Sequence, residues 1–516
     1  MNLKLHGVLD RWDRLSADEI RWYQARRLRE FLARQVLPFS PHYRELFARE
    51  KIDVASIRSL DDLRRIPFTD KSQVCATPDD PGRTLRFVLR PDASLIREHW
   101  PKTALLRLAA RRVVRGAEQV QSELGREYRP TTLIFTTGRS SQPVPFAMTL
   151  YDLEISRVVG SRILEVIGAR PEVDRGVNVF PYAPHLAFWQ VAYCGTAGGM
   201  LMLNTGGGRV MGTDRILDSI ARLKPTFVAG MPGYVYHLLR RAFARGLDLS
   251  SVSSIALGGD NVTMTTKTRL VDLLRELGAK SPRVLSVYGF TEARVCWAEC
   301  SGHPATGFHT YPDLGIFELV DPATGEPVPD GEPGELVYTP LDGRGTVVLR
   351  YRTGDLIQGG IDRSPCPVCG RTVPRVSSAI GRASNQKTFN LTKLKGTLVD
   401  FNSFGAVLGD NPDIEEWQLV VKKQNDDPLE VDEIWLYLCV NARKDEGTVE
   451  KEVRDRILRE TEVNLNRVIF VSMKEILERL GMETDLKEKR ILDQRPPANG
   501  APRVSEPVES GGPGEG

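Results

Sequence analysis

Short apolar runs that alternate with helical stretches between about residues 130 and 295 are the feature that most constrains the fold. The apolar runs include residues 132–135, 227–230 and 252–257, and the helical stretches include residues 234–244 and 266–277. Strands that alternate with helices form a parallel sheet whose ligand-binding loops lie at the strand ends. The sequence therefore predicts an α/β fold in which the chemistry-bearing residues follow the strands.

The pattern of apolar and polar residues changes after this region. Residues 315–357 show alternating patterns and turn clusters such as 330–334, which predict antiparallel hairpins in a small β unit. Beyond residue 381 an α+β pattern follows, with strands expected near 417–421 and 433–440 and a helix over 448–461. We therefore expect a large N-terminal domain over residues 1–381 and a smaller C-terminal lid domain over 382–496.

The two ends of the chain and its overall charge indicate where the protein is located and which kinds of partner it binds. Residues 497–516 are rich in Pro, Gly, Ser and Glu, so we expect a disordered tail. The net charge of +3 comes from 70 basic and 67 acidic residues. This near balance produces no long-range electrostatic field that would attract nucleic acid or an anionic membrane. The N-terminus has no signal-peptide pattern, so a cytoplasmic protein with small-molecule partners is predicted.

Two segments together indicate an ATP site. The first reads Tyr-Gly-Phe-Thr-Glu at residues 288–292, and the second reads Tyr-Arg-Thr-Gly-Asp at residues 351–355. A glutamate after an apolar strand, here Glu292, can hold a magnesium ion that bridges phosphates. An aspartate after a Thr-Gly turn, here Asp355, can accept both hydroxyls of a ribose.

A third segment, residues 136–143, directly follows the apolar run 132–135. Its hydroxyls and backbone amides, at Thr136, Thr137, Gly138 and Ser140 above all, are suited to surround phosphate oxygens. A cluster of this composition after a strand is also an ordinary turn in many proteins.

The seven cysteines do not form the pattern of a disulfide framework, but two of them stand in a C-x-x-C-G arrangement. Cys366 and Cys369, followed by a glycine, form a tight knuckle that directs both sulfurs at one metal ion. A turn of free thiols is the alternative.

In their order along the chain these segments resemble the adenylate-forming superfamily of acyl-CoA synthetases, luciferases and peptide-synthetase adenylation domains. Residues 65–71 and the C-terminal run 487–495 are similar to segments of the phenylacetate-CoA ligase-like branch. Residues 136–143 resemble the phosphate loop of the family, from which Arg139, Ser141 and Gln142 depart.

The resemblance implies roles for individual residues. Thr291, Glu292 and Lys487 are expected to be catalytic, with Lys489 as the substitute for Lys487. The expected nucleotide contacts are Thr136, Thr137, Gly138, Ser140, Gly258, Gly259, Asp260, Tyr288, Asp355 and Arg382. His185, Tyr234 and Phe290 are expected beside the acyl group. Cys300 and His309 would complete a structural zinc site with Cys366 and Cys369, and His303 is the alternative to His309.

The activity implied is the ATP- and Mg²⁺-dependent conversion of a carboxylic acid, by analogy an aromatic one, into an acyl-adenylate and then a coenzyme A thioester. Transfer to a carrier protein or an amine is a second hypothesis. A non-catalytic homologue that only binds a nucleotide is a third. The resemblance leaves open a monomer or a homodimer.

Overall fold

The computed structural model describes residues 5–136, 143–260, 262–382, 391–394, 397–409, 411, 413–424, 432–441, 444–461, 463–482 and 488–495. The chain divides into two compact units. The large unit comprises Met1–Lys387 with Met482–Leu486, and the small unit comprises Thr388–Gly481 with Lys487–Gly516. The tail predicted over residues 497–516 lies outside the described residues, and the boundary placed at residue 381 stays a prediction.

The centre of the large unit is the predicted parallel sheet. It has six strands in the order β4-β3-β5-β6-β7-β8, all parallel except β8, which runs antiparallel to β7. The strands are β3 (Arg175–Asn178), β4 (Leu201–Asn204), β5 (Phe227–Gly230), β6 (Ser254–Leu257), β7 (Arg283–Phe290) and β8 (Val295–Ala298).

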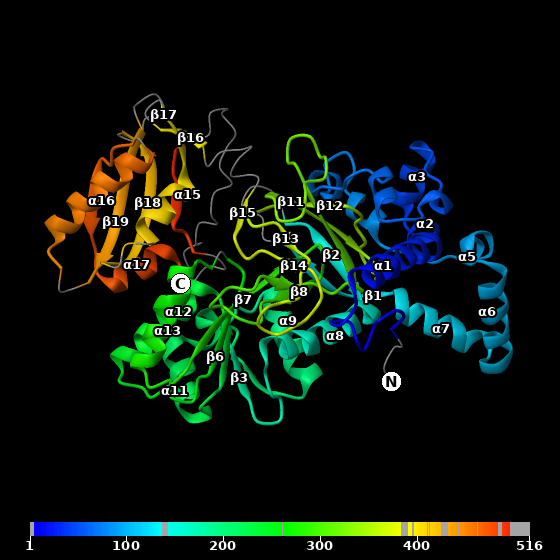
Figure 1. The fold of residues 1–516 in the computed structure, drawn as a ribbon, viewed down its shortest axis with the longest axis horizontal. Coiled ribbons are helices and arrows are strands. Elements are labelled where there is room, and N and C mark those ends of the chain that lie inside the picture. Colours follow the sequence, from blue (N-terminus) through cyan, green and yellow to red (C-terminus); the bar gives the residue numbers. More distant parts are fainter. Residues whose placement is uncertain are drawn as a thin grey trace, which may run out of the picture. The chain divides into compact units, whose positions relative to one another are not determined.

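Helices cover both faces of this sheet (Figure 1). On one face lie α8 (Leu150–Ile167) and α9 (Leu186–Gly198), and on the other α11 (Thr213–Leu223), α12 (Pro232–Ala244) and α13 (Met264–Glu276). A short helix, α10 (Gly208–Met211), precedes α11. Since β5 and β6 are buried along their whole length, their apolar runs have the composition of parallel strands covered on both faces.

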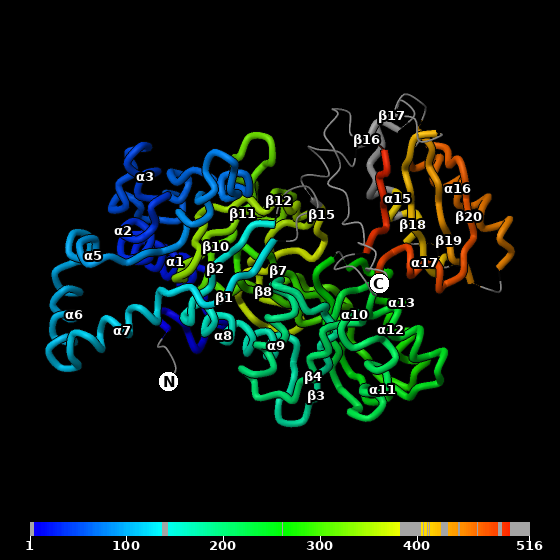
Figure 2. The backbone as a smooth tube through the Cα atoms, turned by 180° about the vertical axis from the view of Figure 1, so that it is seen from behind, coloured from blue at the N-terminus to red at the C-terminus, as the bar shows by residue number. Residues whose placement is uncertain are grey.

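One run assigned to the parallel sheet from sequence lies elsewhere. Residues 132–135 belong to β1 (Pro130–Phe135), which pairs antiparallel with β2 (Pro145–Thr149) as a separate hairpin (Figure 2). The connection between β1 and β2 spans only residues 136–144, which is shorter than the dozen or so residues that a parallel crossover needs. The assignment of 132–135 to the parallel sheet was therefore wrong.

The predicted antiparallel β unit is present. Its four-stranded sheet has the order β10-β11-β12-β15, and a three-stranded sheet has the order β13-β14-β9. The strands are β9 (Phe308–His309), β10 (Gly315–Val320), β11 (Gly334–Pro340), β12 (Tyr351–Ile357), β13 (Ile361–Asp362), β14 (Arg375–Val376) and β15 (Ile380–Arg382).

Helices precede these sheets along the chain. They are α1 (Ala17–Phe31), α2 (Leu37–Phe39), α3 (Pro41–Arg49), α4 (Lys71–Val74), α5 (Ala93–His99), α6 (Lys102–Arg115) and α7 (Ala117–Tyr128), with a π-helical turn over Leu32–Val36 and 3-10 turns over Val54–Ser56, Asp61–Arg65 and Arg83–Phe87. Ser16 and Glu19 form a capping box that fixes the start of α1, because each side chain bonds the backbone of the other.

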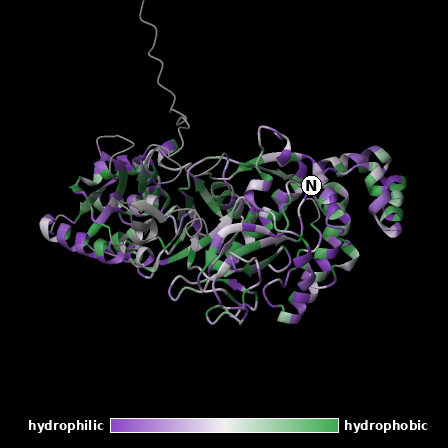
Figure 3. Cartoon of the chain, turned by 90° about the horizontal axis from the view of Figure 1, so that it is seen from above, coloured by the Kyte–Doolittle hydropathy of each residue, from purple (hydrophilic) through white to green (hydrophobic). Residues whose placement is uncertain are grey.

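The small unit has its own four-stranded sheet, in the order β20-β19-β18-β21, and its own apolar core. Its elements are β16 (Leu391–Leu394), β17 (Thr397–Asp400), α15 (Phe401–Gly409), β18 (Ile414–Lys423), β19 (Asp432–Val440), α16 (Glu446–Thr461), β20 (Arg467–Phe470), α17 (Met473–Leu480) and β21 (Ile491–Asp493). The strands and the helix predicted from sequence are all found. In Figure 3 the strands are coloured as mainly hydrophobic, whereas the helices carry both kinds of residue. Within the described ranges no helix has the length and apolarity needed to cross a bilayer.

A buried ion pair joins three parts of the large unit. Arg162 of α8 donates two 2.7 Å hydrogen bonds, one to each carboxylate oxygen of Asp313, which precedes β10. The backbone of Leu9 takes part in the same group, because its N–H donates to Asp313 at 2.8 Å and its carbonyl accepts from Arg162 at 3.0 Å. The Asp313 side chain is fully buried, so every one of its bonds forms in a poorly solvated environment.

Replacing Asp313 with alanine should lower the free energy of unfolding by about 3–5 kcal/mol, because Arg162 would be left as an uncompensated buried charge. Urea unfolding followed by circular dichroism measures the change. Asp272→Ala is the matched control, since Asp272 pairs with Arg275 on the surface at 3.0 Å, and it should cost less than about 1 kcal/mol. Equal losses in the two variants would contradict the assignment.

Candidate active site

The predicted Thr291-Glu292 pair lies on the loop of the β7–β8 hairpin. Phe290 and Val295 are the last paired residues, and the four residues between them form the turn. Two backbone bonds of 3.1 Å close it, from Ala293 N to Phe290 O and from Arg294 N to Thr291 O. Arg294 has a φ of 63°, a left-handed conformation that a residue with a side chain adopts only when its surroundings hold it there.

Two hydrogen bonds cross between the two segments that the sequence pairs. The Tyr288 hydroxyl on β7 donates to Asp355 Oδ2 on β12 at 2.7 Å. The Tyr351 hydroxyl at the start of β12 donates to Glu292 Oε1, just after β7, also at 2.7 Å. Each strand thus supplies one phenol to a carboxylate of the other, although β7 and β12 belong to different sheets. Each of the two predicted ATP-binding carboxylates is thereby bonded to a tyrosine of the other segment.

A third segment meets this loop at the carbonyl of Phe135, the last residue of β1. That oxygen accepts from the Thr291 hydroxyl at 3.2 Å and lies 2.9 Å from Nδ1 of His185. The next residue, Thr136, is buried and closes the base of the predicted phosphate loop, because its N–H donates to Val144 O and its Oγ1 accepts from Val144 N, both at 3.0 Å. Thr137, Gly138 and Ser140 lie outside the described residues, as do Arg139, Ser141 and Gln142.

The predicted glycine segment follows β6 at the same edge of the sheet. A Cβ at Gly258 would lie 2.9 Å from the carbonyl oxygen of Val287, so a larger residue would push β6 and β7 apart. Gly259 has a φ of +83°, which favours glycine for conformational reasons. Asp260 follows as an exposed residue. The segment is thus a close-packed turn against the backbone of Val287, and the adenine contact stays a prediction.

The remaining predicted residues are less closely associated. The backbone of Arg382 pairs with that of Asp355 across β15 and β12, which places it opposite the predicted ribose ligand. Tyr234 is buried, with its hydroxyl 3.2 Å from that of Thr213. Phe290 packs instead among Tyr288, Trp297 and Tyr338, with ring centroids 5.5–5.7 Å away. The acyl-pocket roles of His185, Tyr234 and Phe290 stay predictions, and Lys487 lies outside the described residues.

The predicted metal residues form one cluster. Ligand atoms of Cys300, His309, Cys366 and Cys369 all lie within 4.8 Å of one another. Two pairs are closest, with 3.7 Å between the sulfurs of Cys300 and Cys366 and 3.3 Å between Cys369 Sγ and His309 Nε2. Burial lowers the pKa of His309 to about 4, so the imidazole is neutral near pH 7.

Local structure explains how the knuckle forms. The N–H of Gly370 donates to the carbonyl of Cys366 at 2.9 Å, and Gly370 has a φ of 70° that favours glycine. His303, the alternative ligand, lies outside the cluster and approaches Thr268 instead, at 3.4 Å. Three thiols and one imidazole, mostly buried, are a donor set that suits a closed tetrahedral zinc site.

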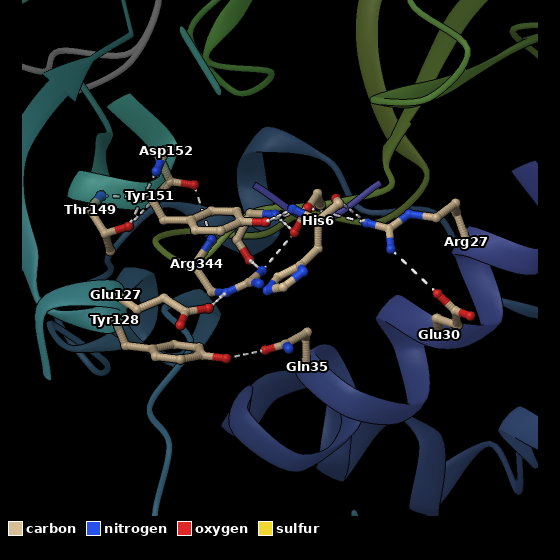
Figure 4. A network of polar contacts seen from close by, with 12 residues as sticks. His6, Arg27, Glu30, Gln35, Glu127, Tyr128, Thr149, Tyr151, Asp152 and Arg344 are labelled. Atoms are coloured by element: carbon tan, nitrogen blue, oxygen red, sulfur yellow. Dashed lines mark hydrogen bonds and ion pairs between the residues drawn. The ribbon is translucent and has the colours of Figure 1, made fainter. Parts of the chain in front are cut away.

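Two residues that anchor the loop of Thr291 and Glu292 were not predicted from the sequence. The guanidinium of Arg294 is buried and lies 3.0 Å from Asp152 Oδ1, in the first turn of α8. Asp152 also accepts from the backbone N–H groups of Thr149, Arg344 and Gly345 at 2.8, 3.0 and 2.8 Å. Figure 4 shows Asp152 between Thr149 and the Arg344 segment. Only the Thr149-x-x-Asp152 capping signature is visible in sequence.

The chain is similar to several known proteins. The AMP-binding enzyme family matches residues 89–341. A phenylacetate-coenzyme A ligase of Thermus thermophilus is 27% identical over 419 residues, which cover 80% of each protein. One of Aromatoleum evansii is 24% identical over 508 residues, which cover 95% of this chain and 98% of that protein.

Among solved structures, 2-hydroxyisobutyryl-CoA ligase in its postadenylation state has a TM-score of 0.70 at 20% identity, covering 94% of this chain and 92% of its own. That similarity supports the fold. Residues 89–341 therefore match the AMP-binding enzyme family, and the chain has a fold similar to that of this ligase. Its sequence is similar to those of phenylacetate-coenzyme A ligases.

Proposed function

We propose that the protein is an AMP-forming acid–CoA ligase. A carboxylate attacks the α-phosphorus of ATP, which breaks the bond to pyrophosphate and gives an acyl-adenylate. The thiol of coenzyme A then attacks the acyl carbon and displaces AMP. The observation that supports this best is the crossed pair of hydrogen bonds that joins the segments of Glu292 and Asp355, in a fold similar to that of a known CoA ligase.

The residues around the loop would mainly provide position and charge. Asp355 would accept the ribose hydroxyls, Tyr288 and the turn at Gly258 would contact the base, and Thr291 would bond the α-phosphate. Glu292 would bind Mg²⁺, which when bound neutralises charge on the phosphates. A carboxylate has about four lone-pair sites, so the bond from Tyr351 is compatible with a metal ligand there. Lys487 would stabilise the charge that develops at the phosphorus.

We propose the substrate by its chemical class. Two of the related proteins are phenylacetate-coenzyme A ligases, so we favour an aromatic acid. The structurally similar 2-hydroxyisobutyryl-CoA ligase argues for testing small aliphatic acids as well. All seven cysteines are free thiols, which fits a reducing cytoplasm, where ATP and coenzyme A are at hand.

The activity is tested with a panel of aromatic and aliphatic acids in the presence of MgATP. We expect acid-dependent pyrophosphate release, and formation of a thioester after addition of coenzyme A. An amide or an acylated carrier protein as the exclusive product would favour the second hypothesis instead. Nucleotide binding by calorimetry without turnover of any acid would support the non-catalytic hypothesis.

Lys487→Ala should lower adenylation by about 100-fold or more, because the variant loses a cation at the reacting phosphorus. Thioester formation from chemically prepared acyl-adenylate should be retained, since that step does not involve the triphosphate. Lys489→Ala is the control from the same segment. If Lys489→Ala abolishes adenylation and Lys487→Ala does not, the role belongs to Lys489.

Tyr351→Phe should raise the Mg²⁺ concentration needed for half-maximal adenylation by about tenfold, because the carboxylate of Glu292 loses the hydroxyl that orients it. A magnesium titration of pyrophosphate exchange measures this shift. Tyr23→Phe, which removes a hydroxyl bonded to Gly7 O, is the control and should leave the titration unchanged. A lower rate at every Mg²⁺ concentration with the same midpoint would argue against an orienting role.

We also propose that Cys300, His309, Cys366 and Cys369 hold a structural zinc ion, supported by their spacing and burial. Elemental mass spectrometry should find about one zinc per chain. Cys369→Ser should remove the zinc and lower the melting temperature by several degrees, as a chelator should in the wild type. Cys75→Ser is the control, because Cys75 is outside the cluster. A zinc-free protein whose melting temperature does not respond to added zinc would refute the assignment.

A further inference from the structure

Helix α6 presents an apolar face to solvent. None of its residues is buried, and Leu106, Val113 and Val114 are 70%, 85% and 82% exposed. Large apolar side chains of this exposure occur singly on most surfaces, but here three belong to one helix of 14 residues. A contiguous exposed apolar face is the kind of surface that binds a partner.

The spacing of the residues explains the exposure. Ala110, Val113 and Val114 follow Leu106 by four, seven and eight positions, so they share one side of the helix with it. Arginines on another side bind α7, because Arg111 and Arg115 pair with Glu123 at 2.6 and 3.1 Å. The inward side of α6 thus combines these arginines with the half-buried Leu105 and Leu108, whereas Leu106, Val113 and Val114 stay exposed.

The charge of α6 has a single sign. The helix carries five cations and no acidic residue: Lys102, Arg107, Arg111, Arg112 and Arg115. Lys102, Arg107 and Arg112 have no ion pair with any residue that the structure describes. The whole chain is nearly neutral, but this one helix is strongly basic. A helix with an apolar side and flanking arginines has the composition of helices that lie in the headgroup region of anionic membranes.

We propose that α6 docks the protein on an anionic lipid surface, with Leu106, Val113 and Val114 inserted at the headgroup boundary and the unpaired cations above them. This proposal departs from the expectation of no membrane partner, which rested on the total charge. Two observations favour lipid over a second copy of the chain. A symmetric contact between two α6 helices would bring like charges together, and the face has no acidic residue to pair with them.

The position of α6 fits such a role. In both Figure 1 and Figure 2 it lies at the margin of the large unit, with β7 and β12 well separated from it. In Figure 3 the helices at the same margin show hydrophobic and hydrophilic residues side by side. Docking through α6 would leave the nucleotide-binding loops uncovered, so activity and membrane attachment are separable.

Co-sedimentation of the full chain with lipid vesicles tests the proposal. We expect the partition coefficient to be at least about tenfold higher on vesicles with about one-third phosphatidylserine than on pure phosphatidylcholine, since each cation near such a surface contributes roughly fivefold. About 0.5 M salt should remove most of this preference by screening. The double variant Val113→Asp and Val114→Asp should bind anionic vesicles no better than neutral ones.

A matched control replaces exposed apolar residues elsewhere. Val173→Asp with Leu201→Asp adds the same charge at positions 58% and 60% exposed, and should bind anionic vesicles as the wild type does. Circular dichroism checks that each variant is folded, and Arg107→Gln with Arg112→Gln provides a second test with the apolar residues intact. The proposal is overturned if the wild type does not bind vesicles, if its binding does not depend on lipid charge, or if the control variant loses as much binding as Val113→Asp with Val114→Asp. It is also overturned if mass photometry shows a dimer that Val113→Asp with Val114→Asp dissociates. Capture of an acidic protein by α6 without lipid binding would overturn it as well.

Discussion

The arrangement of the site depends on two phenol–carboxylate hydrogen bonds that run in opposite directions between β7 and β12. These strands belong to different sheets, so no backbone ladder keeps them in register. The bonds from Tyr288 to Asp355 and from Tyr351 to Glu292 do so instead. Sliding one strand along the other would break both at once, and charge-assisted bonds of this kind are about twice as strong as neutral ones. The parallel sheet and the antiparallel β unit therefore act as one scaffold for the site.

The loop that carries Thr291 and Glu292 is fixed from three directions. The Phe135 carbonyl holds Thr291, Tyr351 holds Glu292, and the buried Arg294 guanidinium reaches Asp152 beneath the turn. The left-handed backbone of Arg294 persists because its side chain is anchored there. A loop held in this way needs little further ordering when a nucleotide arrives, so less binding free energy is lost to entropy.

Local patterns predicted what depends on local sequence. The apolar runs at 227–230 and 252–257 predicted two strands of the parallel sheet. The segments 288–292 and 351–355, which were paired from sequence, are joined by two hydrogen bonds, and their role in ATP binding stays a prediction. The run at 132–135 was assigned to the wrong sheet because the periodicity of a strand does not identify its pairing partner. Arg294 and Asp152 were missed because their pairing is tertiary, and the capping signature at Thr149 and Asp152 does not show which residue Asp152 contacts outside its own helix. The choice between His303 and His309 also needed coordinates, since both spacings suit a metal.

The cysteine–histidine cluster has a consequence for the biogenesis of the site. Cys300 precedes β10, β11 and β12 along the chain, whereas Cys366 and Cys369 follow them. A shared ion would therefore close this stretch into a ring that encloses Tyr351 and Asp355, and closing a long loop removes much of the freedom of the unfolded segment. The supply of metal during synthesis would then govern whether newly made chains mature, long before any substrate is encountered.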